Sequence, residues 1–230
     1  MVLSNYKEDM IMDLKEAMQK RHMVRKYIDK SLPDDLINRI NERISMNNEK
    51  HKLSMKLMIN NNKGVNSIMK LIMAKGVNNF IILAGDNSEN LDERLGYSGA
   101  DIMLYAQTLG LNTWWVGGTF NRSVSQYVEN KKVTGIIAIG YGESQGKPHK
   151  SKMVEDVSKY NGTVIPSWFI SGVDGALLAP TALNKQDFMI IGDGNKVKIE
   201  CDNGIFTGSN VGLIKYHFEL GAGKENFEWE

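Results

Sequence analysis

Phe80-Ile81-Ile82-Leu83-Ala84-Gly85 is a short run of apolar residues that no polar side chain interrupts. Such a run is typical of a strand that is buried on both faces of a sheet. A second apolar run, Ile136-Ile137-Ala138-Ile139, lies between Gly135 and Gly140, and its β-branched isoleucines favour a strand over a helix. The two runs therefore predict the middle of a central sheet.

Helical and strand periodicities extend outward from these runs. We expect helices over residues 6–20, 31–46, 91–109, 123–130, 167–178 and 212–220, and further strands over 53–57, 113–116, 188–192 and 197–201. The turn residues Asp193-Gly194-Asn195 join the last two strands into a hairpin. The helix over 91–109 carries small residues that would let another element approach closely: Gly96, Ser98, Gly99, Ala100 and Ala106. The mixture predicts an α+β fold, and the sequence contains no apparent internal repeat.

Length and composition narrow the class of protein. The chain has 230 residues, enough for one large domain or two small ones. Lys and Arg total 28 against 27 for Asp and Glu, so no global charge attracts nucleic acid or an anionic membrane. The single cysteine, Cys201, excludes an internal disulfide and fits a reducing compartment. No apolar run approaches the ~18 residues of a membrane span, and residues 1–15 do not resemble a secretion signal. We therefore expect a cytoplasmic protein.

Two basic segments have side chains suited to an anionic ligand. Arg21-His22-Met23-Val24-Arg25-Lys26-Tyr27 carries two arginines four residues apart, which can surround a phosphate. The alternative is a solvated helix end whose cations complement the helix dipole. Lys147-Pro148-His149-Lys150-Ser151-Lys152 is a small basic loop, for which simple solvation is again the alternative.

Two further segments suit a planar, polar ligand. Gly117-Gly118 follows an apolar strand and permits close backbone approach, although a loop that needs positive φ would also explain the glycines. Pro180-Thr181-Ala182-Leu183-Asn184-Lys185-Gln186 offers amide donors and acceptors for a heterocycle or hydroxyls, or is simply a polar turn. The sequence shows no phosphate loop, dinucleotide fingerprint or serine elbow, and its four histidines lack metal-ligand spacing. We expect no metal site and chemistry carried by a cofactor.

Taken together, the four segments resemble motifs of the FMN-dependent nitroreductase family. Arg21–Tyr27 is similar to the opening Arg-x-Ser-x-Arg/Lys phosphate motif, with Met23 in place of serine. The strand at 136–142 and the basic loop after it resemble the last core strand and phosphate tail, with Lys152 where arginine is common. The segment 115–118 resembles the stretch beside the reactive flavin nitrogen. The segment 180–186 resembles the Pro-Ser-x-x-Asn-x-Gln-Pro-Trp flavin motif, with Asp187-Phe188 in place of Pro-Trp.

The order of the motifs resembles a subgroup in which one chain imitates the usual dimer. In ordinary members the Asn-x-Gln motif closely follows the arginine motif, whereas here it comes in the last third of the chain. The resemblance implies a nitroreductase-like first half, residues 1–151, with a central mixed sheet surrounded by helices. It implies a smaller second half, residues 152–230, that supplies the Asn-x-Gln motif and completes the flavin site. We expect a monomer or weak homodimer with one FMN per chain; the alternative is that the second half swaps onto a neighbouring chain.

The function implied by the resemblance is that of an oxidoreductase. NADH or NADPH would reduce FMN, which would pass electrons to a small electron-poor acceptor such as a nitroaromatic or a quinone. The alternatives are an FMN store or redox sensor without steady turnover, and, within the same fold, a dehalogenase or flavin-cleaving enzyme. The flavin carries the chemistry, so no catalytic side chain is assigned. The implied FMN-binding residues are Arg21, His22, Met23, Arg25, Trp115, Val116, Gly117, Gly118, Lys150, Lys152, Pro180, Thr181, Ala182, Asn184 and Gln186.

Overall fold

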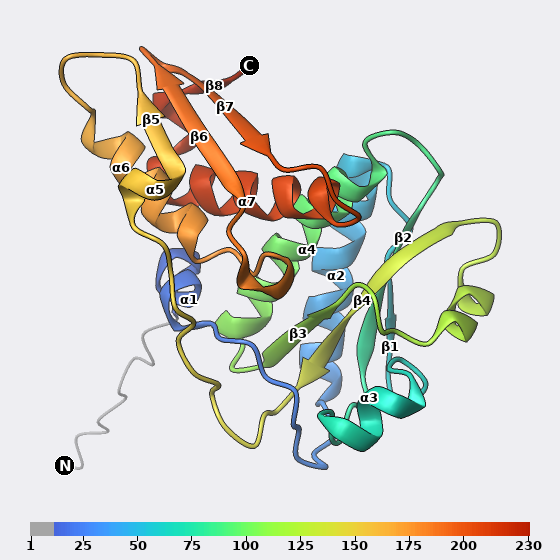
Figure 1. Ribbon diagram of the computed structural model, residues 1–230. Helices are drawn as coiled ribbons and strands as arrows, with labels where there is room; N and C mark the ends of the chain where they lie inside the picture. Colours follow the sequence, from blue (N-terminus) through green and yellow to red (C-terminus); the bar gives the residue numbers. More distant parts are fainter. Residues whose placement is uncertain (1–11) are drawn as a thin grey trace, which may run out of the picture.

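The computed structural model describes residues 12–230, and its strands form two separate sheets (Figure 1). The part of the helix expected over 6–20 that precedes residue 12 lies outside the described residues. The first sheet has the strand order β1-β2-β4-β3, with β1 at Lys56–Met58, β2 at Phe80–Gly85, β3 at Asn112–Val116 and β4 at Lys132–Gly140. The second has the order β5-β6-β7-β8, with β5 at Ser158–Tyr160, β6 at Phe188–Asp193, β7 at Lys196–Cys201 and β8 at Glu228–Trp229.

The two apolar runs lie in the middle of the first sheet, as predicted. Every residue of β2 is buried, and so are the last six residues of β4. The four strands pair antiparallel because β4 lies between β2 and β3. The parallel pairing that we expected in this sheet is confined, within residues 12–230, to a bridge between Met23 and Thr113. The second sheet is the mixed one, since β6 and β7 pair antiparallel while β5 and β8 are parallel to their neighbours.

The helices confirm the α+β class and extend some of the predicted bounds. They are α1 at Leu14–Lys20, α2 at Asp34–His51, α3 at Ser67–Ile72, α4 at Leu91–Thr108, α5 at Val154–Val157, α6 at Ser167–Leu177 and α7 at Thr207–Ala222. Three short 3₁₀ segments are η1 at Arg122–Tyr127, η2 at Ala182–Asn184 and η3 at Lys224–Asn226. α2 continues past the predicted end at Met46 because Asn47 and Asn48 bond to distant groups, which local periodicity does not register. Between residues 12 and 230, no helix is long and apolar enough to cross a membrane.

The two sheets contain a structural repeat that the sequence does not reveal. β2, α4 and β3 form a strand–helix–strand unit whose two strands run parallel, with β4 inserted between them. β7, α7 and β8 form a second such unit, without the inserted strand. The corresponding elements begin at Phe80 and Lys196, at Leu91 and Thr207, and at Asn112 and Glu228, each pair 116 positions apart. The second part of the chain therefore repeats the central unit of the first.

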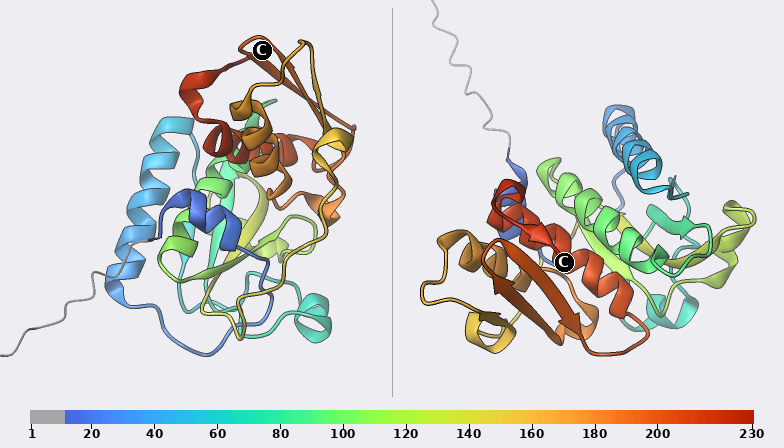
Figure 2. Two further views of the ribbon diagram at one scale, coloured as in Figure 1. Left: turned by 90° about the vertical axis from the view of Figure 1, so that its left-hand side faces the viewer. Right: turned by 90° about the horizontal axis from the view of Figure 1, so that it is seen from above.

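The two repeated helices pack against each other between the sheets (Figure 2). A Cβ atom on Gly96 of α4 would lie 2.2 Å from the carbonyl oxygen of Ser209, and one on Gly212 of α7 would lie 2.0 Å from that of Glu93. Gly96 and Gly212 are 116 positions apart, and so are Glu93 and Ser209. The contact of Gly96 with Ser209 therefore corresponds to the contact of Gly212 with Glu93. Such a reciprocal contact is the mark of a two-fold interface between copies of one unit.

The packing of α4 on α7 joins the two parts into one core. All strands of the first sheet precede residue 151 and all strands of the second follow residue 152. A single cluster of buried apolar side chains nevertheless includes Ile102 on α4, Phe218 on α7 and Phe169 on α6. The division into parts 1–151 and 152–230 stays a prediction.

The close crossing predicts a large effect of a very small substitution. Gly96→Ala should lower the free energy of unfolding by about 2 kcal/mol, because the new methyl group forces the two backbones apart. This loss outweighs the gain of about 1 kcal/mol that alanine brings to an isolated helix. Urea denaturation measures the difference. In the control Gly204→Ala, the added Cβ meets no atom closer than 3.7 Å, so stability should change by less than about 0.5 kcal/mol. Unchanged or increased stability of Gly96→Ala would contradict the tight crossing.

Candidate functional site

The first basic segment begins where α1 ends. Arg21 leaves the helix with extended backbone angles, and its N–H donates to the Ala17 carbonyl (2.8 Å). The chain then runs extended beside β3, where the Val24 N–H donates to the Thr113 carbonyl (3.2 Å). Arg21 is buried and Arg25 half-buried in this segment, whereas Met23 is 45% exposed. The segment is thus not the solvated helix end that was the alternative.

Arg21 is a buried cation that forms no ion pair within the described residues. Only 6% of the residue is exposed, and its Nε–H has no acceptor within residues 12–230. Burial lowers the pKa of Arg21 to about 10. The half-buried Arg25 has its guanidinium carbon 5.5 Å from the Trp114 ring centroid, and its Nε–H also lacks an acceptor in the described chain. Burying a charged group without a partner is costly, so these two guanidinium groups suit an anion supplied from outside.

The basic loop and the Asn-x-Gln segment lie together, although 34 residues separate Lys152 from Gln186. Gln186 is 1% exposed; its Oε1 accepts from the Lys152 N–H (2.7 Å) and its Nε2 donates to the Leu177 carbonyl (2.8 Å). The Asn184 side chain donates to the Lys150 carbonyl (2.7 Å). Gln186 therefore fixes the path of the basic loop.

The side chains of this basic loop remain accessible. Lys150 and Lys152 are exposed, and the Lys152 ammonium donates to the Gln186 carbonyl (2.9 Å) and lies 3.4 Å from the Asp187 carboxylate. Burial, then Arg21, then His149 lower the pKa of His22. The two basic segments approach each other just before the loop, where a Cβ on Gly146 would lie 2.8 Å from the Cβ of His22 and 2.9 Å from the Met23 carbonyl oxygen.

The turn over 180–186 has an unusual backbone. Leu183, Asn184 and Gln186 have φ of 54°, 54° and 52°, in the left-handed region. Asparagine tolerates this region, whereas leucine and glutamine seldom adopt it, and such strain often accompanies binding sites. Pro180 is half-buried and Thr181 is 7% exposed, with its Oγ1 near the Gln186 N–H (3.4 Å).

The paired glycines face the start of α7. A Cβ on Gly117 would lie 2.8 Å from the Phe206 ring, and one on Gly118 would lie 3.6 Å from it. The Ala182 N–H donates to Asn210 Oδ1 on α7 (3.0 Å), so the 180–186 turn reaches the same end of that helix. Trp115 and Val116, both expected to bind the cofactor, have their side chains in the packed interior: the Trp115 ring meets Gly99 of α4 and Val116 is 2% exposed.

Three residues of this region escaped the sequence analysis. Phe206 and Asn210 come from the first turns of α7, which begins five residues before the predicted start at Gly212. His217 is fully buried on α7; its Nδ1 donates to the Leu213 carbonyl (2.8 Å) and its Nε2 has no partner in the described chain. Burial, with a smaller contribution from the charge of Arg21, lowers the pKa of His217 to about 3 against the opposing effect of the hydrogen bond to Leu213. The sequence held no signal for these residues because their positions depend on α7 crossing α4.

The four segments that sequence motifs selected are therefore linked in space. Contacts run from His22 and Met23 to Gly146 just before the basic loop, from that loop to the 180–186 turn, and from the turn through α7 to Gly117-Gly118. The Nε–H groups of Arg21 and Arg25, unpaired within the described residues, fit the phosphate end of FMN, and the missing side chain of Gly117 lets the Phe206 ring approach the backbone. A cavity of about 460 Å³ lies elsewhere, lined by residues of α2, α4 and α7 that belong to none of these segments.

Comparisons with known proteins show the family and the fold of the chain. The model of the family described as "Putative TM nitroreductase" matches residues 13–222, and the chain belongs to this family. A Thermotoga maritima protein described as a "putative nitroreductase" is similar over 98% of this chain and 90% of its own, with 19% identity and a TM-score of 0.69. No curated protein matches the chain.

Two shorter proteins share the fold over about two thirds of the chain. A "putative nitroreductase in complex with fmn" from Desulfovibrio desulfuricans covers 63% of this chain and 94% of its own, with 16% identity and a TM-score of 0.51. A "putative NADH dehydrogenase/NAD(P)H nitroreductase" from Parabacteroides distasonis covers 65% and 98%, with 16% identity and a TM-score of 0.52. The nitroreductase resemblance and the α+β fold are confirmed.

The buried His217 predicts a pH dependence of stability. Its pKa is about 3 in the folded chain against an ordinary 6.5, so between these values the unfolded chain binds a proton that the folded chain does not. Stability should therefore fall as the pH drops from 6.5 toward 3, by at most about 1.4 kcal/mol per pH unit from this residue. His217→Gln removes this titration, so its unfolding free energy should decline less steeply over the same range. Parallel pH profiles of the two proteins would contradict the assignment.

Proposed function

We propose that this protein is an FMN-dependent oxidoreductase that passes electrons from NADH or NADPH to a small electron-poor acceptor such as a nitroaromatic or a quinone. The observation that carries the proposal is Arg21, a buried guanidinium to which residues 12–230 supply no carboxylate, in a chain of the nitroreductase family. A phosphate at this position would supply the missing negative charge and accept the unpaired N–H.

The remaining motif residues would hold the cofactor from both parts of the chain. Arg21, Lys150 and Lys152 would bind the phosphate, and Arg25 would lie at the edge of the ring where negative charge develops on reduction. The Gly117-Gly118 backbone would lie beside the ring. Asn184 would contact the flavin from the second part, while Gln186, with both ends of its amide bonded to backbone, would position the basic loop.

Bound FMN would accept a hydride from the nicotinamide and reduce the acceptor, so the protein needs no acid–base pair of its own. FMN in the Desulfovibrio structure and the NAD(P)H in the description of the Parabacteroides protein support this choice of cofactor and donor. We place the protein in the cytoplasm, a reducing compartment that suits its single cysteine. Burial raises the pKa of Cys201 to about 11, which keeps this thiol protonated.

Replacing Arg21 tests the phosphate assignment. Arg21→Ala should weaken FMN binding roughly tenfold to a hundredfold, because a charge-assisted hydrogen bond to a buried group contributes about 1.5–3 kcal/mol. Titration of the apoprotein with FMN, followed by flavin fluorescence, measures the change. The exposed Arg122, on η1, provides the matched control, and Arg122→Ala should bind FMN like the parent. Equal affinity of the Arg21 variant and the parent would refute the assignment.

A turnover assay then separates an enzyme from a flavin store. The FMN-loaded protein should oxidise NADH or NADPH steadily when a nitroaromatic or quinone is present. One reduction of the bound flavin, without continued oxidation of the nicotinamide, would instead identify a store or redox sensor.

The position of the motifs also predicts how the protein assembles. We propose that one chain holds one FMN and that the protein is a monomer or a weak homodimer. Mixing Arg21→Ala chains with Asn184→Ala chains should then fail to restore FMN binding, because neither chain contains an intact site. Recovery of binding in the mixture would show that the second part swaps onto a neighbour, and light scattering on the loaded protein gives the mass.

A further inference from the structure

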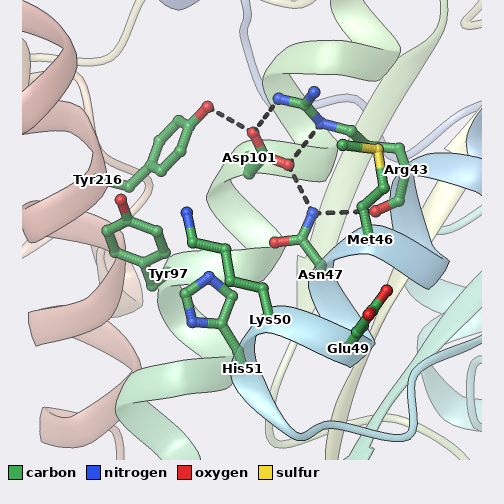
Figure 3. A pocket seen from close by; sticks show the side chains of 9 residues that line it. All are labelled: Arg43, Met46, Asn47, Glu49, Lys50, His51, Tyr97, Asp101 and Tyr216. Atoms are coloured by element: carbon green, nitrogen blue, oxygen red, sulfur yellow. Dashed lines mark hydrogen bonds and ion pairs between the residues drawn. The ribbon is translucent and has the colours of Figure 1, made fainter.

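The cavity of about 460 Å³ lies between the last turns of α2 and the facing sides of α4 and α7 (Figure 3). Its volume is within the range of pockets that bind small molecules. None of its lining residues belongs to the segments assigned to FMN, so the cavity is separate from that site.

The one buried carboxylate of the cavity is already saturated. Asp101 accepts hydrogen bonds from Arg43 Nε (2.7 Å) and Nη2, from Asn47 Nδ2 (2.7 Å) and from the Tyr216 hydroxyl (2.6 Å). Arg43 neutralises its charge. The network therefore fixes three helices around the cavity and leaves no carboxylate oxygen free for a cation.

The cavity lining includes two exposed charged residues, Lys50 and Glu49, that form no ion pair within residues 12–230. In Figure 3 the Lys50 ammonium points toward Tyr97. The carboxylate of Glu49 points away from the other labelled side chains. Burial lowers the pKa of His51, and Lys50, Arg94 and Lys224 lower it further against the opposing effect of Asp101.

Two other cations near the cavity, Lys224 and Arg94, are already bonded. Lys224 pairs with Glu219 (3.0 Å). Arg94 donates to the carbonyl oxygens of His51 (2.6 Å) and Lys52 (3.1 Å), which offsets the negative end of the α2 dipole. An anion that enters the cavity therefore meets the Lys50 charge without repulsion from the end of α2.

Aromatic rings form the opposite wall. The His51 and Tyr97 centroids are 5.3 Å apart, and the Tyr97 and Tyr216 rings meet edge to face at 5.1 Å. Ring walls of this kind favour a planar apolar group. A free ammonium beside such a wall selects a ligand with a flat apolar body and one negative end.

We propose that this cavity binds a small aromatic carboxylate, with the carboxylate at Lys50 and the ring against Tyr97. The site is independent of the FMN site and does not rest on the proposed function.

Calorimetry on the full chain, with benzoate as the probe, tests the proposal. Benzoate should bind saturably and at least tenfold more tightly than benzyl alcohol, which has the ring without the charge, and than acetate, which has the charge without the ring. Lys50→Gln should weaken benzoate binding at least fivefold and Lys50→Glu should abolish it. The exposed Lys63, in a turn away from the cavity, provides the control Lys63→Gln, which should bind like the parent.

Two further measurements separate this cavity from the FMN site. Arg21→Ala should retain its benzoate affinity, and Lys50→Glu should retain its FMN affinity and its urea midpoint, since Lys50 is exposed. Benzoate binding that is lost in Arg21→Ala and kept in Lys50→Glu would place the ligand at the FMN site and overturn the proposal. Absence of benzoate binding, or equal binding of benzyl alcohol, would also overturn it.

Discussion

The close contact between the backbones of α4 and α7 sets the geometry of the whole chain. Gly96 and Gly212 leave no side chain between the helices, so each approaches a carbonyl oxygen of the other. Short connections join α4 to β2 and β3, and α7 to β7 and β8. The crossing therefore fixes one sheet relative to the other, and it also brings Phe206 at the start of α7 against Gly117 after β3.

The crossing of α4 and α7 makes the chain resemble two joined copies of one unit. The charged residues near α4 nevertheless differ from those near the corresponding part of α7. Asp101 on α4 and His217 on α7 occupy corresponding places, 116 positions apart. Beside His217 lies Arg21, a buried cation for which the described chain supplies no carboxylate. Asp101, in contrast, neutralises Arg43. A buried guanidinium needs an opposing charge, so the surroundings of Arg21 have a strong electrostatic reason to bind a phosphate. Among the described residues, the surroundings of Arg43, which Asp101 already neutralises, have only the exposed ammonium of Lys50.

The local sequence pattern predicted a helix or strand closely where the apolar residues of that element recur with the period of its backbone. The apolar runs of β2 and β4 and the spacing of α4 predicted these elements closely, because burial in a sheet or on a helix face repeats with the period of the backbone. The final turn of α2 was missed because polar residues 47–51 carry no such period, and Asn47 stays helical through its bond to Asp101. The antiparallel pairing of the first sheet, which was expected to be mixed, was also missed, since β4 follows β3 along the chain but inserts between β3 and β2.

For the candidate site, the sequence by itself determined which chemical groups are present: two arginines, a basic loop, an amide-rich turn and paired glycines. It also determined the order of the motifs, on which the proposal of one complete FMN site per chain rests. Only the tertiary structure decided which of these groups are buried, which are already bonded to each other, and which lack a partner. Burial and pairing depend on contacts between residues far apart in the chain, such as Lys152 with Gln186 and α4 with α7, and no local pattern records them.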